Sequence, residues 1–302
     1  MASLSWRVCA LAAGLALVGT AHAAEAVRFA HGRSVYADAL GAALHRPEGV
    51  ACGADGTVVV ADTGNGRLVR YTVSGAALDG GTELKIPQAT YPVRLHLSSK
   101  GEILVLDGKL RQVLRLSAAG QFLAAVEPRG APGSAIAVYR SFALDREDNV
   151  YFLDAFGRRV LVTDPSGAFQ RELPFPGSFG FISDLAVDPR GTVFLLDSVA
   201  GALYGAEKGS SAFTLLTAEL KQYSNFPTHL ATDARGGVYA VDQNGAGVLV
   251  LGQDGTYRGR QLALGWKEGL VYYPAQLCLT ATEEAIIADR ENNRVQVFRV
   301  IR

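Results

Sequence analysis

The chain of 302 residues carries 29 Lys and Arg and 29 Asp and Glu side chains, so its formal charge is zero. Without a basic excess there is little electrostatic support for binding DNA or RNA, and we expect no nucleic-acid partner. The three cysteines show none of the paired spacings of redox, haem-attachment or zinc-ribbon sites.

The first residues have the features of a secretory signal. Arg7 precedes an apolar stretch from Val8 to Val18, and Ala21-His22-Ala23 fits the small-x-small cleavage pattern. The stretch is too short for a membrane span, and no later one approaches the roughly 18 apolar residues that a span needs. We therefore expect residues 1–23 to be a signal peptide. Residues 24–302 would form one exported domain, periplasmic or extracellular, without a transmembrane segment.

A short apolar run that ends in aspartate recurs six times along the chain. The aspartates are spaced by 45, 47, 43, 45 and 47 residues, and such a regular period indicates a repeat architecture. The six are Asp62, Asp107, Asp154, Asp197, Asp242 and Asp289.

Each unit has the same internal order. An apolar strand, often opened by a proline fifteen residues before the aspartate, is followed by a Gly-rich turn and by the strand that ends at the aspartate. A third strand, another Gly turn and an outer fourth strand complete the unit. Six such units predict an all-β protein, a six-bladed β-propeller.

The two ends of the chain predict how the ring closes. The sixth unit stops after its third strand at Arg302, and an extra strand-like segment, Ala26 to Ala30, precedes the first unit. We expect this N-terminal strand to pair with residues around Val295 to Val300, which would remove an open sheet edge.

The recurring aspartates have a sufficient structural role. An aspartate at a strand end can accept hydrogen bonds from the next turn and from an arginine five residues on, as in Asp62 with Arg67 and Asp289 with Arg294. A residue that varies between units is the better candidate for function.

Two such positions lie on the face of the ring that carries the aspartate turns, called the Asp-turn face below. The residue before the proline position is Arg46, Tyr91, Phe226 or Tyr273 in four units, and the residue two after it is Arg94, Asp184, His229 or Gln276. Trp266 and Tyr272 add to the aromatic sector of the last two units, and Tyr, Trp and Arg are typical interface anchors. These ten residues are the candidate binding residues. The alternative is that they are solvated or pack the blade edges.

Cys52 and Cys278 lie in the first strands of units one and six, which are neighbours in a closed ring. They point to opposite faces of their own sheets, so they could meet across the closure seam. We expect two buried free thiols, with the disulfide as the alternative.

The first and last units resemble NHL repeats, whose pattern is Pro-x-Gly-Val followed by Val-x-Asp-x-x-Asn-x-Arg-Val. The segments are Pro47-Glu48-Gly49-Val50 with Val60 to Leu68, and Pro274 to Leu277 with Ile286 to Phe298. The resemblance implies a six-bladed propeller and, most often, a platform that binds protein or nucleic acid.

Two enzyme families of similar fold supply the alternative function. The Ala288-to-Asn292 segment resembles peptidylglycine amide lyases, which use a zinc held by three histidines, and gluconolactonase-type lactonases use calcium at the channel mouth. Here the ligands would be Glu48, Asp184 and His229, although the histidines sit at different offsets and an expected Asn is missing. We favour a scaffold or accessory subunit without a cofactor, monomeric outside its complex, that binds a protein or peptide through the Asp-turn face.

Overall fold

The structure is a computed structural model that describes residues 27–133 and 137–302. The expected signal peptide, residues 1–23, lies outside the described residues. None of the described helices is long and apolar enough to cross a membrane.

In the described part of the chain, twenty-four strands form six four-stranded antiparallel sheets, one for each blade. Blade 1 contains β2 (Gly49–Cys52), β3 (Thr57–Asp62), β4 (Arg67–Ser74) and β5 (Ala77–Leu84). Blade 2 contains β6 (Pro92–Leu97), β7 (Ile103–Asp107), β8 (Gln112–Leu116) and β9 (Phe122–Val126). Blade 3 contains β10 (Tyr139–Leu144), β11 (Val150–Asp154), β12 (Arg159–Thr163) and β13 (Phe169–Pro174). Blade 4 contains β14 (Ile182–Val187), β15 (Val193–Asp197), β16 (Ala202–Ala206) and β17 (Thr214–Thr217). Blade 5 contains β18 (Pro227–Thr232), β19 (Val238–Asp242), β20 (Gly247–Leu251) and β21 (Tyr257–Gln261). Blade 6 contains β22 (Pro274–Leu279), β23 (Glu284–Asp289), β24 (Arg294–Ile301) and β1 (Arg28–Val35).

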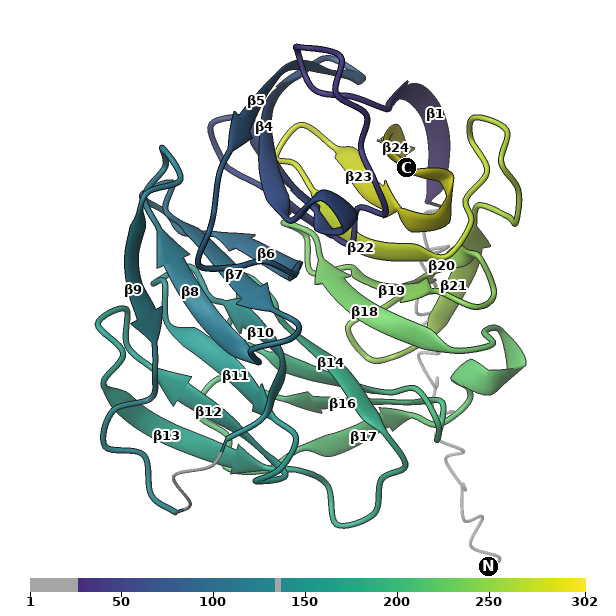
Figure 1. Ribbon diagram of the computed structural model, residues 1–302. Helices are drawn as coiled ribbons and strands as arrows, with labels where there is room; N and C mark the ends of the chain where they lie inside the picture. Colours follow the sequence, from purple (N-terminus) through teal and green to yellow (C-terminus); the bar gives the residue numbers. More distant parts are fainter. Residues whose placement is uncertain (1–26, 134–136) are drawn as a thin grey trace, which may run out of the picture.

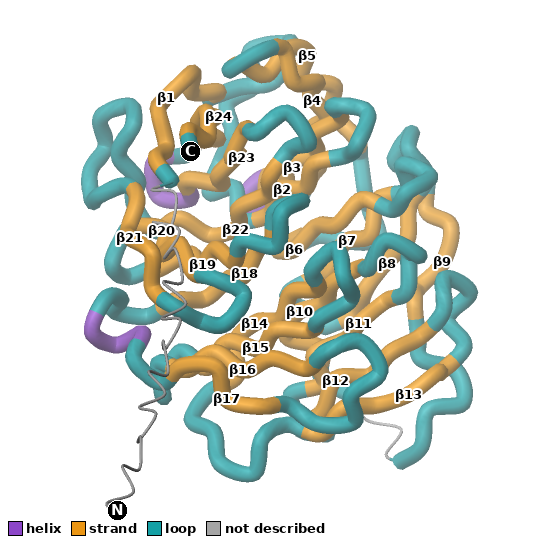
Figure 2. Tube along the Cα trace, turned by 180° about the vertical axis from the view of Figure 1, so that it is seen from behind, coloured by secondary structure: helices purple, strands orange, loops and turns teal. Residues whose placement is uncertain are grey.

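The blades stand around a central axis, with the first strand of each unit innermost (Figure 1) and the same ring visible from behind (Figure 2). β1 pairs antiparallel with β24, from Arg28 opposite Ile301 to Val35 opposite Val295. The predicted six-bladed propeller and its closure by the N-terminal strand are therefore confirmed.

The core is a set of apolar layers between neighbouring blades. Side chains alternate across a strand, so Val58 and Val60 pack toward blade 6 while Val59 and Ala61 pack toward blade 2. The middle strands are covered on both faces, which is why they read as continuous apolar runs and not as alternating ones.

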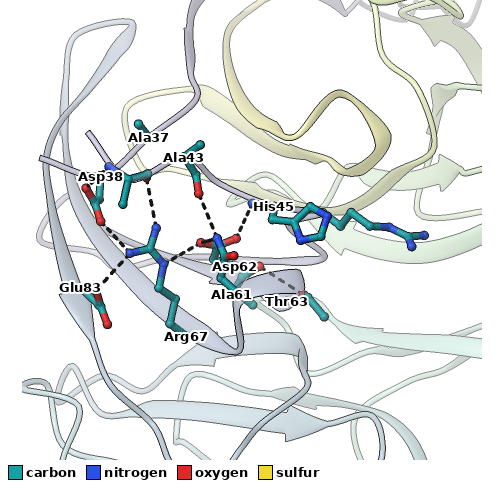
Figure 3. Close-up of polar contacts among 12 residues, drawn as sticks. Ala37, Asp38, Ala43, His45, Ala61, Asp62, Thr63, Arg67 and Glu83 are labelled. Atoms are coloured by element: carbon teal, nitrogen blue, oxygen red, sulfur yellow. Dashed lines mark hydrogen bonds and ion pairs between the residues drawn. The ribbon is translucent and has the colours of Figure 1, made fainter. Parts of the chain in front are cut away.

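The six aspartates are buried acceptors, as Asp62 illustrates in Figure 3. Its Oδ1 accepts the His45 N–H at 2.7 Å, and its Oδ2 accepts Arg67 Nε at 2.7 Å and Asn65 Nδ2 at 2.8 Å. Arg67 Nη1 also donates to Asp38 Oδ2 at 2.7 Å. The aspartate therefore holds both the segment that leads into the blade, through His45, and the turn that follows β3, through Asn65 and Arg67.

Blades without the arginine satisfy their aspartates differently. Asp197 accepts four backbone N–H groups, and Asp242 takes its arginine, Arg260, from the outer strand at 2.9 Å. Each turn thus keeps a buried carboxylate without needing the same cation.

Cys52 and Cys278 form a disulfide, with Cα atoms 5.7 Å apart. The expectation of two free thiols was wrong. The bridge forms because neighbouring blades pack opposite faces together, which brings the innermost strands β2 and β22 side by side at the closure seam.

Candidate functional site

The centre of the ring is crossed by long polar side chains. Arg94, on β6, reaches across the channel to donate to the Thr228 carbonyl at 2.8 Å and the Ala275 carbonyl at 3.5 Å. Gln276, on β22, accepts the Val50 N–H at 3.2 Å and the Leu95 N–H at 3.1 Å. These contacts link blades that are far apart along the chain.

A buried acid and histidine complete the channel network. Asp184 Oδ2 lies 2.7 Å from His229 Nδ1 and accepts the Leu230 N–H at 2.7 Å. His229 Nε2 lies 3.0 Å from the Leu277 carbonyl. The Ser141 hydroxyl lies near Asp184, but Asp184 Oδ1 has no hydrogen-bond partner among the described residues.

The charges of this network are set by its burial and by Arg94. Burial alone would raise the pKa of Asp184, but Arg94 and His229 outweigh it and hold that pKa at about 2. Burial and Arg94 lower the pKa of His229, although Asp184 opposes them. At neutral pH the channel therefore holds one carboxylate, one guanidinium and a neutral histidine.

The innermost strands explain why these residues are polar. The inner edge of each first strand has no neighbouring strand, so its N–H and C=O groups need other partners. Arg94, Asp184, His229 and Gln276 supply many of them. Three of these four candidate residues, Asp184, His229 and Gln276, are buried, so a docked macromolecule could not touch them while the network is closed.

The residues of the metal alternative are not gathered at one point. Glu48 lies 3.2 Å from Arg290 Nε, with the Tyr91 hydroxyl 3.5 Å away, while Asp184 and His229 contact each other. In residues 27–133 and 137–302, no three His, Cys, Asp or Glu side chains are grouped so that they could hold a metal ion.

The other candidates lie at the surface of the Asp-turn face. Arg46 is exposed and pairs with Glu291 at 2.8 Å. Phe226 is half-buried near Phe181, and Tyr272 lies between Trp266 and Tyr273 with ring centroids 6.4 and 5.3 Å away.

The aspartate turns of blades 2, 3 and 4 present apolar side chains to solvent. Leu110, Phe156 and Val199 are 56%, 61% and 50% exposed, and Trp266 in the connection from blade 5 to blade 6 is 75% exposed. Six exposed apolar side chains of this face form what we call the apolar collar: Leu110, Phe156, Val199, Leu264, Trp266 and Tyr273.

Sequence reasoning found Trp266 and Tyr273 but missed the three turn residues. The sequence does mark these three residues, because each is apolar and lies within the three positions after its aspartate. The same positions are Thr63-Gly64-Asn65 in unit one and Arg290-Glu291-Asn292 in unit six. Asn65 and Asn292 donate to their aspartates at 2.8 Å, a task that backbone N–H groups perform in blades 2 to 4.

The opposite end of the channel holds a cavity of about 200 Å³. Apolar side chains, the Cys52–Cys278 disulfide and the imidazoles of His96 and His229 line it. Burial, together with repulsion from His229 and Arg94, lowers the pKa of His96 to about 4, so its ring is neutral at pH 7.

The sequence pattern of the NHL repeat matches residues 44–71 and 271–298, which cover the joined first and last blades. These matches, together with the six-bladed ring, support an NHL-repeat propeller family. No curated protein sequence matches it.

Solved structures of other propellers superpose over nearly the whole chain. A streptogramin B lyase matches with a TM-score of 0.62 and 12% identity over 91% of this chain and 97% of the other. A catalytically inactive virginiamycin B lyase from Staphylococcus aureus with quinupristin matches with a TM-score of 0.64 and 11% identity, covering 91% and 100%. A gluconolactonase from Xanthomonas campestris matches with a TM-score of 0.65 and 15% identity, covering 90% and 98%. At this identity the likeness establishes the fold alone.

Proposed function

We propose that this NHL propeller is an exported binding module that docks a protein or peptide partner on its Asp-turn face. The observation that carries the proposal is the apolar collar. Three blades and one long connection contribute exposed apolar side chains to one end of the ring. Clustered apolar exposure on a soluble fold is typical of interaction sites.

The polar neighbours of the collar complete an interface of the usual composition. Arg46 and Glu291 pair at the surface, and Lys109 lies 5.0 Å from the centre of the Tyr91 ring. Exposed apolar side chains with aromatic and Arg anchors and charged neighbours are typical of protein interfaces. Arg94 and the buried channel network form a floor that a partner would cover without entering.

The disulfide supports the export part of the proposal. Structural disulfides persist in oxidising compartments and are rare in a reducing cytosol. The Cys52–Cys278 bridge joins the seam of the ring, where an exported propeller would gain from a covalent link. Cellular fractionation with non-reducing mass mapping tests both points. A protein found in the cytosol with two free thiols would contradict export.

Site-specific photo-cross-linking tests the binding face. A cross-linking residue placed at Trp266 or Phe156 should capture the same partner in the native compartment. Leu215 on β17 is a matched control, because it is equally exposed but lies on an outer strand. Capture of the same partner from position 215, or none from 266 and 156, would overturn the proposal.

A second candidate function is an enzyme that uses the channel. It is favoured by the unpartnered, buried Asp184 Oδ1 beside His229, and by the similarity to streptogramin B lyase and gluconolactonase structures. Assays with a streptogramin B and with a gluconolactone, each with added divalent metal, decide it. Activity lost in Asp184→Asn and His229→Gln variants that remain folded would favour the enzyme, and inactivity of the wild type would exclude both substrates.

A further inference from the structure

The outer strand of blade 2 is apolar, carries no charged residue and has a β-bulge at Leu123. β9 reads Phe122-Leu123-Ala124-Ala125-Val126, and its first four residues are exposed. It lies at the periphery of the ring (Figure 1), and no described strand pairs with its outer edge. Both faces of the strand therefore show apolar side chains next to unpaired backbone groups.

Most other outer strands carry features that discourage edge pairing. β5 contains Asp79 and Glu83, β13 contains Arg171 and ends at Pro174, and β21 and β1 carry two arginines each. Charges and prolines at such positions are the usual protection against association of sheet edges. β17 is uncharged but has only four residues. β9 alone is five residues long with no charge, Gly or Pro.

We propose that β9 is a homodimerisation edge, on which β9 of a second copy pairs antiparallel. The sequence of the strand is self-complementary about Ala124, and a pairing in this register would take the bulged Leu123 into the ladder. Phe122 would lie opposite Val126 of the second copy, and Leu123 opposite Ala125. Aromatic with β-branched pairs stabilise antiparallel sheets, and direct pairing would bring no like charges together.

The residues that flank the strand fit the same register. Gln121 would lie opposite Glu127, an amide beside a carboxylate, so neither end of the pairing opposes two carboxylates. The two blades would form one sheet of eight strands. The apolar collar would stay free in both copies, because its blade 2 member, Leu110, lies in the turn between β7 and β8 and not on β9.

Sedimentation of the processed protein over a range of concentrations tests the proposal. A small, strand-only interface predicts a reversible dimer with a dissociation constant in the micromolar range. Leu123→Lys should leave a monomer with an unchanged melting temperature, whereas Leu215→Lys on β17 should dimerise like the wild type. A wild type that stays monomeric, or a Leu123→Lys variant that still dimerises, overturns the proposal.

A cysteine at the centre of the strand tests the register. In a Cys9→Ser background the native cysteines are bridged, so Ala124→Cys introduces one free thiol. Directly paired residues have Cα atoms about 4.5–5.5 Å apart, within reach of a disulfide. Mild oxidation should give a covalent dimer with Ala124→Cys and none with the control Leu215→Cys. Equal cross-linking of both variants, or of neither, overturns the antiparallel register.

Discussion

Arg294 fixes the connection that carries Trp266. Its guanidinium is almost fully buried and donates to Asp289 at 2.7 Å and to the carbonyls of Trp266, Lys267 and Leu270 at 2.8–3.1 Å. A single side chain thus joins the aspartate turn of blade 6 to the loop that projects the exposed indole. The exposure of Trp266 is therefore a fixed property of the fold.

Removal of this cation should be costly. Arg294→Met removes the cation beside the buried Asp289 carboxylate and the donor to the Trp266 and Lys267 carbonyls, and we expect a loss of about 3 kcal/mol in the free energy of unfolding. Urea denaturation measures it. Arg159→Met is the matched control, because Arg159 holds the same place in blade 3 but one of its partners, Glu172, is exposed. It should lose less than Arg294→Met, because the Arg159 guanidinium is more exposed and donates to one loop carbonyl, that of Pro132. Equal losses would show that burial does not set the cost.

His96 should make the ring sensitive to mild acid. Its folded pKa of about 4 lies below its unfolded value, so the unfolded state binds more protons between pH 6.5 and 4. The stabilising contribution is complete above pH 6.5 and is lost as the pH falls toward 4. By pH 5 we expect a loss of roughly 2 kcal/mol.

His96→Gln should flatten this dependence in urea titrations at pH 7.5 and 5. His45→Gln changes an exposed histidine and should keep the wild-type slope. If His96→Gln loses as much free energy between the two pH values as the wild type, the acid sensitivity belongs to other groups.

For single residues, the sequence predicted the structural role of a side chain better than it predicted which residues that side chain contacts. The aspartates recur because every turn needs a buried acceptor, so their role followed from the repeat itself. Asp184 and His229 were chosen because they break the repeat. What they face across the channel depends on residues about 45 positions away, and strand alternation in one blade does not contain that information.

The disulfide is the main stabilising device among the elements. It links β2 to β22 over a sequence separation of 226 residues, and a loop of that length predicts a large entropic contribution. We expect the double variant Cys52→Ala, Cys278→Ala to lose about 2–4 kcal/mol in calorimetry, even though β1 still closes the ring. Reduction of the wild type should give the same loss. An unchanged melting temperature after complete reduction would contradict this.

The strands themselves were predictable, and the bridge was not. Apolar runs bounded by Gly turns located the four strands of each unit, and the shortened last unit indicated the closing strand. Whether two cysteines meet depends on the relative height of β2 and β22, which packing of the assembled ring decides.

At the scale of the whole molecule the two ends of the channel differ in kind. The Asp-turn end has a closed polar floor with an apolar collar, and the other end has a small cavity lined by the disulfide and His96. Under the proposed function, the Asp-turn face is the one that would take a large partner. The asymmetry comes from side chains in a few turns, because the backbone of all six blades is alike.

Substitution of Trp266 should affect partner binding without much effect on stability. Because its side chain is largely exposed, Trp266→Ala should change the free energy of unfolding by about 0.5 kcal/mol or less. Partner capture should fall strongly, since truncation of such an anchor typically costs about 2 kcal/mol or more. Calorimetry and cross-linking yield measure the two effects. A variant that unfolds would identify Trp266 as a packing residue instead.

The pairing of β1 with β24 has a consequence for chain connectivity. Arg28 lies directly opposite Ile301, so the start of the first described strand and the end of the last one are neighbours in blade 6. A short peptide could join them, and new ends could be opened at any of the exposed Gly turns that connect strands. The folded ring therefore does not depend on which blade comes first along the chain. We expect circular permutants that start at another blade to form the same ring.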